Sequence, residues 1–378
     1  MAIHPPPSGP RTGDRSTMKT VSALLAELVA YPTQQAGHEH GPGDERALCD
    51  HLAPLLRARG ADSVIVESTV RSDGSPGAYI FAHWGTPTRV INAHVDTVPA
   101  NAGWSREPWQ PHIADGRLYG LGSADTKGAI AATLVALENA KPRDVGVLFS
   151  GDEEAGSAVM KAFLDTPLAA KIREVIVCEP TARVAGTAHR GIFAQRATLL
   201  GPGGHSSKAD HLPKPIAQLA RLAVALDEAG RRRIHDGPPG MTGTCLNIAG
   251  LHGGVAYNVI PARGELEWSL RPYPGFDRAS WDREVAELIA SIDPAISLTT
   301  AIEHVPFACD ALADLVQPFA ARVGPLDFWT EAAMWSAHGA DAIVIGPGDI
   351  AQAHAADEWV ALDDLDWAVA MFRTLINR

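Results

Sequence analysis

Cysteine is scarce in this sequence. The 378 residues contain four cysteines, which lie far apart and form no CxxC pair: Cys49, Cys178, Cys245 and Cys309. Their spacing argues against a structural zinc–thiolate site, and their low number argues against a disulfide framework. Such usage is typical of a reducing compartment, so we expect a cytoplasmic protein.

Long apolar runs are also missing. Residues 1–17 are rich in Pro, Gly and Ser and lack the apolar segment of a signal peptide. We predict that they form a disordered tail or precede a true start at Met18. The apolar stretch 21–30 is interrupted by Glu27 and is too short to span a bilayer. The sequence therefore predicts no membrane attachment.

An excess of positive charge is absent as well. The formal net charge is −12 at pH 7, which argues against nucleic acid or an anionic membrane surface as a partner. Hydrophobic residues make up 46% and charged residues 20% of the chain, so a large buried core is expected rather than disorder. This balance fits an enzyme that acts on small molecules.

The order of predicted elements indicates two domains. Strands and helices alternate over residues 18–189, which predicts an α/β catalytic domain with a central mixed sheet flanked by helices. Residues 190–304 follow the order β-α-β-β-α-β of a ferredoxin-like module. The α/β pattern resumes over residues 305–378, where a helix is expected at 311–323. The module is therefore predicted to be an insertion in the catalytic domain.

Acidic residues and histidines form five clusters, four of them at the ends of predicted strands. In NAHVDTVP, His94 and Asp96 are two residues apart, so on a strand they share a face. A carboxylate beside a ligating imidazole fixes its tautomer. The other clusters contain, in chain order, Asp125, Glu153 with Glu154, Glu179, and His354.

Ligands of open α/β sheets bind at the carboxyl ends of the strands. Two histidines and three carboxylates that converge there suit two zinc ions sharing one carboxylate. Each cluster alone has a simpler explanation, because a lone His94 is more often a surface or core residue and Glu153 is also suited to a helix start. The segment GPGGHSS, which contains His205, lacks both a phosphate-binding pattern and a GxSxG elbow.

The motifs HVDTVP, GLGSADTKG, SGDEEAG, CEPT and AHAADE occur in this order. Together they resemble the zinc metallopeptidase family of acetylornithine deacetylase, succinyl-diaminopimelate desuccinylase, aminoacylase-1 and carboxypeptidase G. The resemblance runs from about Met18 to the C-terminus and is closest to the acetylornithine and N-acetylcitrulline deacetylase branch. The stretches DFWTEAAMWSAHG and GPGDIAQAHAADEW particularly resemble the acetylcitrulline enzymes.

The resemblance implies a dinuclear site with two zinc ions per chain, for which cobalt is able to substitute. One zinc would be held by His94, Asp125 and Glu179. The other would be held by Glu154, His354 and the bridging Asp125. Glu153 would act as general base and acid, and Asp96 would be the partner that orients His94.

The resemblance also implies a homodimer, with the inserted module as lid and dimerisation domain. His205 matches the family histidine that reaches the site of a neighbouring subunit. Asn258 and Arg271 match residues expected to hold the substrate α-carboxylate, although Arg271 also fits a surface strand. Thr330 and Glu331 are expected at the side-chain end of the pocket, where Glu331 would attract an ammonium or accept hydrogen bonds from a ureido group.

The preferred function is hydrolysis of the amide of an N-acylated amino acid in arginine biosynthesis. N2-acetylornithine is placed slightly ahead of N-acetylcitrulline as substrate. Two alternatives stay open: a dipeptidase or carboxypeptidase-like enzyme of the same family, and a non-catalytic dimeric binding protein. Cobalt or manganese as the native metal is also open, because carboxylate-rich sites accept several divalent ions.

Overall fold

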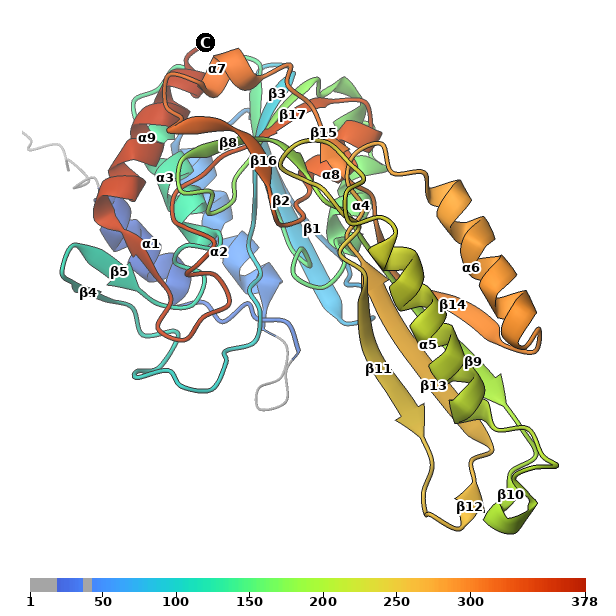
Figure 1. The fold of residues 1–378 in the computed structure, drawn as a ribbon. Helices are drawn as coiled ribbons and strands as arrows, with labels where there is room; N and C mark the ends of the chain where they lie inside the picture. Colours follow the sequence, from blue (N-terminus) through green and yellow to red (C-terminus); the bar gives the residue numbers. More distant parts are fainter. Residues whose placement is uncertain (1–18, 37–42) are drawn as a thin grey trace, which may run out of the picture.

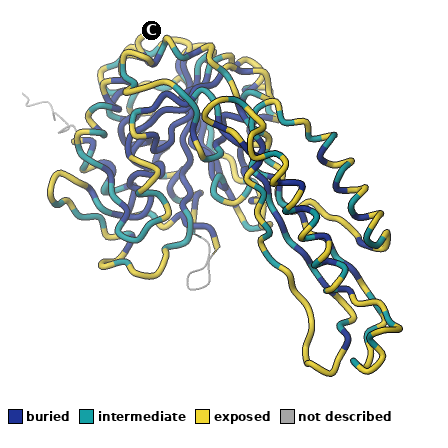
Figure 2. Tube along the Cα trace, viewed as in Figure 1, coloured by how far each residue is buried: buried dark blue, intermediate teal, exposed yellow. Residues whose placement is uncertain are grey.

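The computed structural model describes residues 19–36 and 43–378. The predicted tail over residues 1–17 and the predicted start at Met18 lie outside the described residues. Figure 1 shows a large body (residues 19–36, 43–191 and 305–378) and a narrow small body (residues 192–304) that extends away from it. Buried residues fill the large body, whereas the far tip of the small body is mostly exposed (Figure 2).

A mixed sheet forms the centre of the large body, as the sequence predicts. Its strands are β1 (Ser63–Val70), β2 (Pro76–Trp84), β3 (Arg89–His94), β6 (Val145–Ser150), β7 (Glu174–Val177), β8 (Val184–His189), β15 (Phe307–Ala308), β16 (Arg322–Leu326) and β17 (Asp341–Val344). They lie in the order β1-β2-β6-β3-β7-β17-β8-β15, with β16 beside β8. The central strands β6, β3, β7 and β17 run parallel, and β1 and β2 are antiparallel. All residues of β6 are buried, as expected for a strand covered on both faces.

Two separate hydrophobic cores cover the two faces of this sheet. Alternate residues point to opposite faces, so Ile91 packs in one core and Val90 in the other. The first core is formed with α1 (Val21–Val29), α2 (Glu45–Ala58), α3 (Lys127–Leu137) and α9 (Leu362–Ile376). The second is formed with α4 (Ala158–Leu164) and α8 (Ala332–Ala337). No helix in the described ranges is long and apolar enough to cross a membrane.

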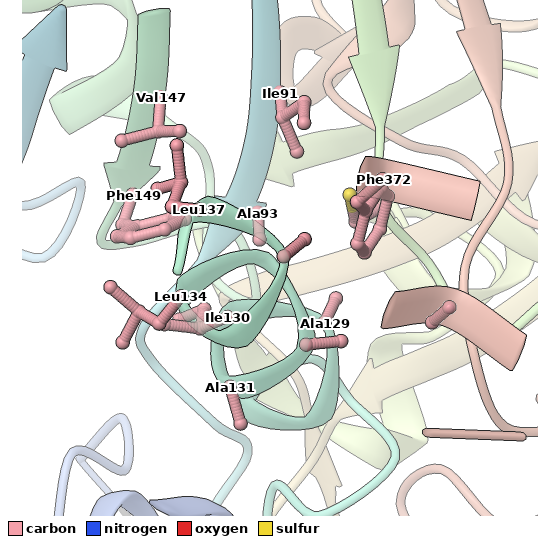
Figure 3. Close-up of a cluster of buried hydrophobic side chains, with 14 of the residues drawn as sticks. Ile91, Ala93, Ala129, Ile130, Ala131, Leu134, Leu137, Val147, Phe149 and Phe372 are labelled. Carbon is pink, nitrogen blue, oxygen red and sulfur yellow. The ribbon is translucent and has the colours of Figure 1, made fainter. Parts of the chain in front are cut away.

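Helix α3 is buried on nearly all sides. Figure 3 shows Ile130 and Leu134 of α3 beside Phe149 of the sheet, with Phe372 of α9 on the other side. Ten of its 11 residues are buried, including four alanines that allow close approach to its neighbours. The helix is therefore held firmly, and so is the turn before it that carries Asp125.

The predicted helix over residues 311–323 is wrong for most of its length. Only α7 (Ala313–Val316) is helical, and residues 322–326 form the parallel strand β16. Pro318 lacks the backbone N–H that a continuing helix requires. Ala321 N donates instead to Arg183 O at 2.8 Å, which leads the chain into pairing with β8.

The small body has its own core and its own antiparallel sheet. Its main elements are β9 (Ile192–Leu200), α5 (Pro215–Arg231), β11 (Asn247–Gly253), β13 (Arg263–Leu270), α6 (Arg278–Ile292) and β14 (Ser297–His304). The sheet order is β11-β13-β9-β14, and the chain order is the β-α-β-β-α-β expected for residues 190–304. At the far tip, β10 (Gly204–His205) pairs with β12 (Val259–Ile260). A lid or dimerisation role for this body stays a prediction.

A small three-stranded sheet lies at the periphery of the large body. It contains β4 (His112–Ala114), β5 (Arg117–Tyr119) and β18 (Trp359–Ala361), in the order β18-β5-β4. Strand β18 begins directly after Glu358, and β5 ends shortly before the turn that carries Asp125. This sheet therefore joins two distant segments of the chain beside the site described next.

Candidate metal centre

Three neighbouring strands deliver acidic and histidine side chains to one edge of the central sheet. Strands β6, β3 and β7 are adjacent and parallel, so their carboxyl ends meet there. His94 is the last residue of β3, Glu153 and Glu154 lie in the turn after β6, and Glu179 follows β7. The edge thus gathers side chains that are far apart in the sequence.

Asp125, before α3, and His354, in the loop between β17 and β18, complete the cluster. His94 Nε2 lies 2.9 Å from Asp125 Oδ1 and 3.9 Å from Glu179 Oε2. His354 Nε2 lies 2.9 Å from Glu154 Oε2 and 3.6 Å from Asp125 Oδ2. Asp125 therefore presents one oxygen to each histidine, so it is the carboxylate that two metal ions would share.

The donor atoms fit a zinc site in type and spacing. One ligand atom each from His94, Asp125 and Glu154 lies within 4.8 Å of the other two. Imidazole nitrogen and carboxylate oxygen are common zinc donors. The same donors also accept cobalt or manganese, so the chemistry of the set defines a divalent cation rather than one element.

Buried acid groups crowd the space around these ligands. Five carboxyl side chains there are at most 6% exposed: Asp96, Asp125, Glu179, Glu331 and Glu358. A buried cation beside them is Lys127, but its Nζ donates to the backbone oxygen of Tyr31 at 2.8 Å rather than to a carboxylate. Ionised carboxylates are costly to bury without a nearby positive charge. A divalent cation supplies that charge.

The pKa directions agree with this need for a cation. Burial raises the pKa of Glu179 well above its ordinary range, and burial together with the charge of Glu179 does the same for Glu153. Burial acts to lower the pKa of His94, but hydrogen bonds to Asp125 and Asp96 outweigh it and raise that pKa. Because ligands bind metal in their deprotonated forms, a cation takes the place of these protons.

Asp96 orients His94 and also holds the turn after β6. His94 Nδ1 lies 3.0 Å from the backbone oxygen of Asp96 and 3.5 Å from its Oδ1. A carbonyl oxygen only accepts, so Nδ1 carries a proton, and Nε2, which faces Asp125, is the nitrogen that a metal would bind in place of its own proton. The Asp96 carboxylate also accepts the backbone N–H groups of Glu153 and Glu154, both at 3.1 Å. The second role was not predicted from the sequence.

Glu358 is a site residue that the sequence analysis missed. Its buried carboxylate accepts hydrogen bonds from the backbone N–H groups of Gly122, Ala124 and Asp125 at 2.9, 2.8 and 3.1 Å. It therefore fixes the turn that carries the bridging Asp125, whose peptide bond to Thr126 is cis. A sequence signal existed, because Glu358 closes the AHAADE motif and stands directly before the apolar strand β18.

Thr330 and Glu331 are buried rather than exposed on the wall of a pocket. Thr330 is fully buried, and its Oγ1 is 3.1 Å from His189 Nε2. Glu331 is 2% exposed and accepts a hydrogen bond from Ser150 Oγ at 2.7 Å. Burial raises the pKa of Glu331 to about 7. Because both side chains are covered, this conformation does not fit the prediction that they face the side chain of a substrate.

The remaining predicted residues lie on the small body, away from the cluster. Arg271 follows the end of β13 nearest the large body, whereas Asn258 lies beyond the opposite end, next to β12. An eight-residue strand is roughly 25 Å long, so one chain cannot hold one carboxylate with both residues. His205 is exposed in β10 at the same far tip as Asn258 (Figure 1). Within one chain, neither tip residue joins the metal cluster.

Comparisons with known proteins agree with this geometry. The model of the family described as peptidase family M20/M25/M40 matches residues 90–378. N-acetyl-L-citrulline deacetylase of Xanthomonas campestris pv. campestris is 38% identical over 380 residues, which covers 96% of this chain and 98% of that protein. Acetylornithine deacetylase of Myxococcus xanthus is 31% identical over 382 residues, with coverages of 92% and 94%.

A solved structure supports the same architecture. An M20 family metallo-carboxypeptidase from Sulfolobus solfataricus matches with a TM-score of 0.74, over 95% of this chain and 99% of that chain. Its sequence identity is 17%, so this likeness concerns the fold. It extends over both the large and the small body.

Proposed function

Because the chain belongs to peptidase family M20/M25/M40 and is a metal-dependent amidohydrolase of the acetylornithine deacetylase type, we propose that it removes the acetyl group of an N-acetylated amino acid in arginine biosynthesis. N-acetyl-L-citrulline is the first candidate substrate and N2-acetylornithine the second. The observation that carries the hydrolytic part is the convergence of His94, Asp125 and Glu154 at one sheet edge, with Glu153 beside them.

The proposed substrate order reverses the one predicted from the sequence. Identity is 38% to the acetylcitrulline enzyme and 31% to the acetylornithine enzyme, each over more than 90% of the chain. Glu331, which was expected to attract the ammonium of ornithine or to accept hydrogen bonds from the ureido group of citrulline, is buried against Ser150, so it does not decide between the two substrates.

Two zinc ions are proposed to occupy the cluster, one with His94, Asp125 and Glu179 and one with Asp125, Glu154 and His354. The chemistry that zinc supplies when bound is activation of a water molecule near neutral pH and polarisation of the amide carbonyl. Glu153 takes the proton from the attacking water and gives it to the leaving amine as the C–N bond breaks. Asp96 keeps Glu153 in place because its carboxylate accepts a hydrogen bond from the backbone N–H of Glu153.

A homodimer is proposed to complete the site. The attacked carbonyl oxygen gains negative charge and requires a donor, and His205 is such a donor at the exposed tip of the small body. Tyr257 and Val255, at the same tip, are almost fully exposed apolar side chains, which supports contact with a second copy. Mixing Glu153→Ala subunits with His205→Ala subunits is expected to restore part of the activity. A mixture as inactive as its two components contradicts this arrangement.

The experiment that tests the proposed function is an initial-rate assay on zinc-loaded protein with both acetylated substrates. Faster hydrolysis of N-acetyl-L-citrulline supports the proposal, and faster hydrolysis of N2-acetylornithine reverses the substrate order. Glu153→Ala is the control, with an expected loss of roughly 10²–10⁴-fold in kcat. If neither substrate is hydrolysed while a dipeptide is, the deacetylase proposal fails and a peptidase of the same family replaces it.

A further inference from the structure

A buried ion pair lies outside the proposed ligand set. Glu45 is the first residue of α2, and its Oε1 is 2.8 Å from Arg71 Nε. Both side chains have no exposed surface. The Glu45 carboxylate also accepts the backbone N–H of Ala78 at 2.8 Å, and Arg71 Nη2 donates to the backbone oxygen of Gly43 at 3.2 Å. The pair therefore links α2 to β2 and to Gly43, in the segment before α2.

Two glycines leave the room that this pair needs. A Cβ on Gly151 would lie 1.9 Å from Glu45 Oε2, and a Cβ on Gly77 would lie 2.8 Å from Arg71 Cγ. Neither glycine has a positive φ among the described residues, so space rather than backbone conformation explains them. Gly151 is the first residue after β6, which brings the pair directly against the turn that carries Glu153 and Glu154.

Two buried carboxylates hold three consecutive N–H groups of that turn. Glu45 Oε1 accepts from Asp152 N at 3.1 Å. The Asp96 carboxylate accepts from Glu153 N and Glu154 N, as described above. The backbone of the turn is therefore fixed from two sides, by Asp96 on the side of His94 and by Glu45 on the side of α2.

The residue after Arg71 holds the same turn through a side chain. The Asp152 carboxylate accepts from Ser72 N at 2.9 Å, from Ser72 Oγ at 2.7 Å and from Ala158 N at 2.8 Å. Residues 71 and 72 thus contact the turn by two routes, one through Glu45 and one directly. Helix α4 begins at Ala158, so the far end of the turn is anchored as well.

We propose that Glu45 and Arg71 are positioning residues, which place the general base Glu153 and the metal ligand Glu154 by holding the N–H of Asp152. This inference rests on the proposed roles of Glu153 and Glu154. Misplacement of a reacting group by about 1 Å can cost on the order of 100-fold in rate. Loss of Glu45 is therefore expected to lower both the rate of the chemical step and the affinity for zinc, although Glu45 is neither the general base nor a proposed zinc ligand.

The test compares Glu45→Gln with a matched control, Glu138→Gln. Glu138 pairs with Arg59, the C-cap residue directly after α2, and these two side chains are 17% and 11% exposed. The control thus breaks a partly buried ion pair at the other end of the same helix. Zn²⁺ affinity is measured by competition with a chromogenic chelator, kcat and KM are measured on zinc-loaded protein, and Tm is recorded for each variant.

We expect Glu45→Gln to lower kcat roughly 10- to 100-fold and zinc affinity by a similar factor, with KM nearly unchanged. Glu138→Gln is expected to lower Tm without either effect. Glu45→Gln leaves Arg71 buried without its partner and keeps one oxygen that accepts from Asp152 N. A Glu45→Met/Arg71→Met variant, which lacks that oxygen and the buried charge, is therefore measured beside it and is expected to fold with at least the same loss of zinc affinity.

Zinc titration of the wild type and of the Glu45 variants separates this inference from the proposed function. If the wild-type protein binds no zinc, the proposed function fails. If the wild type binds zinc and both Glu45 variants keep its affinity and its kcat, the pair serves only to stabilise the fold and the inference is overturned. The zinc titration decides this even if neither acetylated substrate is hydrolysed.

Discussion

The carboxyl edge of the central sheet and the tip of the small body differ in whether one chain alone supplies the groups that their proposed roles require. At the edge, the histidines and carboxylates proposed as metal ligands come from five separate segments of one chain, and carboxylates such as Asp96 and Glu358 hold the turns between them. At the tip, His205 and Asn258 are exposed next to the apolar Tyr257. The proposed metal site is thus contained within one chain, whereas the proposed role of the tip needs a second copy. The two functions should therefore separate experimentally.

The largest effect is expected at the bridging carboxylate. Asp125→Asn removes the charge that faces both His94 and His354. Metal polarisation contributes several kcal/mol to the transition state, so we expect a fall in kcat of roughly 10³-fold or more. Metal analysis should show loss of both zinc ions in the same variant. Retention of two zinc ions would show that Asp125 does not bridge them.

The second effect is expected at the tip. His205→Ala should lower kcat roughly 10²- to 10³-fold, which is the usual cost of removing one donor to an oxyanion. Its zinc content should stay at the wild-type value, because the tip is not part of the cluster. His211→Ala is the matched control, since His211 is also exposed on the segment after β10. Equal losses in the two variants would show that His205 has no special role.

A smaller effect is expected in the stability of the metal-free protein. Burial raises the pKa of Glu331 from 4.5 to about 7 and that of Glu358 from 4.5 to about 8. The folded chain therefore keeps protons that the unfolded chain releases, so the free energy of unfolding falls as the pH rises from 5 to 7. His189, with its pKa lowered to about 4, opposes this only up to pH 6.5, and Lys127 contributes only above its pKa of about 7.

Thermal unfolding of the metal-free protein measures this effect. We expect Tm to fall by on the order of 5 °C between pH 5 and pH 7. Added zinc should remove most of the fall, because a cation takes the place of the protons. The same slope with and without zinc would show that the acid groups at the sheet edge are not paired with a metal.

The ligands and their supports differ in how far the sequence predicts them. His94, Glu154 and Glu179 follow apolar strands, and the carboxyl ends of parallel strands share one edge, so their meeting follows from the order of elements. Glu45 and Glu358 are not predicted, because each follows another acidic residue and a pair of acidic residues is usually solvated. Only the packing of α2 against the sheet and of β18 against β5 makes them buried acceptors of backbone hydrogen bonds.

Two other differences have equally local causes. The helix expected over residues 311–323 stops early because Pro318 ends it and β8 offers hydrogen bonds to the next segment. Asn258 and Arg271 were expected to act together, but the strand between them keeps them apart within one chain. The spacing of Asn258 and Arg271 along the chain does not tell how two copies of the protein are arranged. Their joint role at one substrate therefore stays a prediction.

The smallest effect is expected in the choice between the two acetylated substrates, and it tests whether the large body recognises the substrate side chain. If Glu331 contacted the side chain of the substrate, Glu331→Gln would change the ratio of kcat/KM for N-acetyl-L-citrulline and N2-acetylornithine. Because Glu331 is 2% exposed and bonded to Ser150, we expect this ratio to stay within about twofold even if both rates fall, since a lost structural contact acts on the two substrates alike. A change of tenfold or more would show that Glu331 becomes exposed when substrate binds. In that case the recognition of the side chain belongs to the large body, and the tip of the small body serves only the reacting carbonyl.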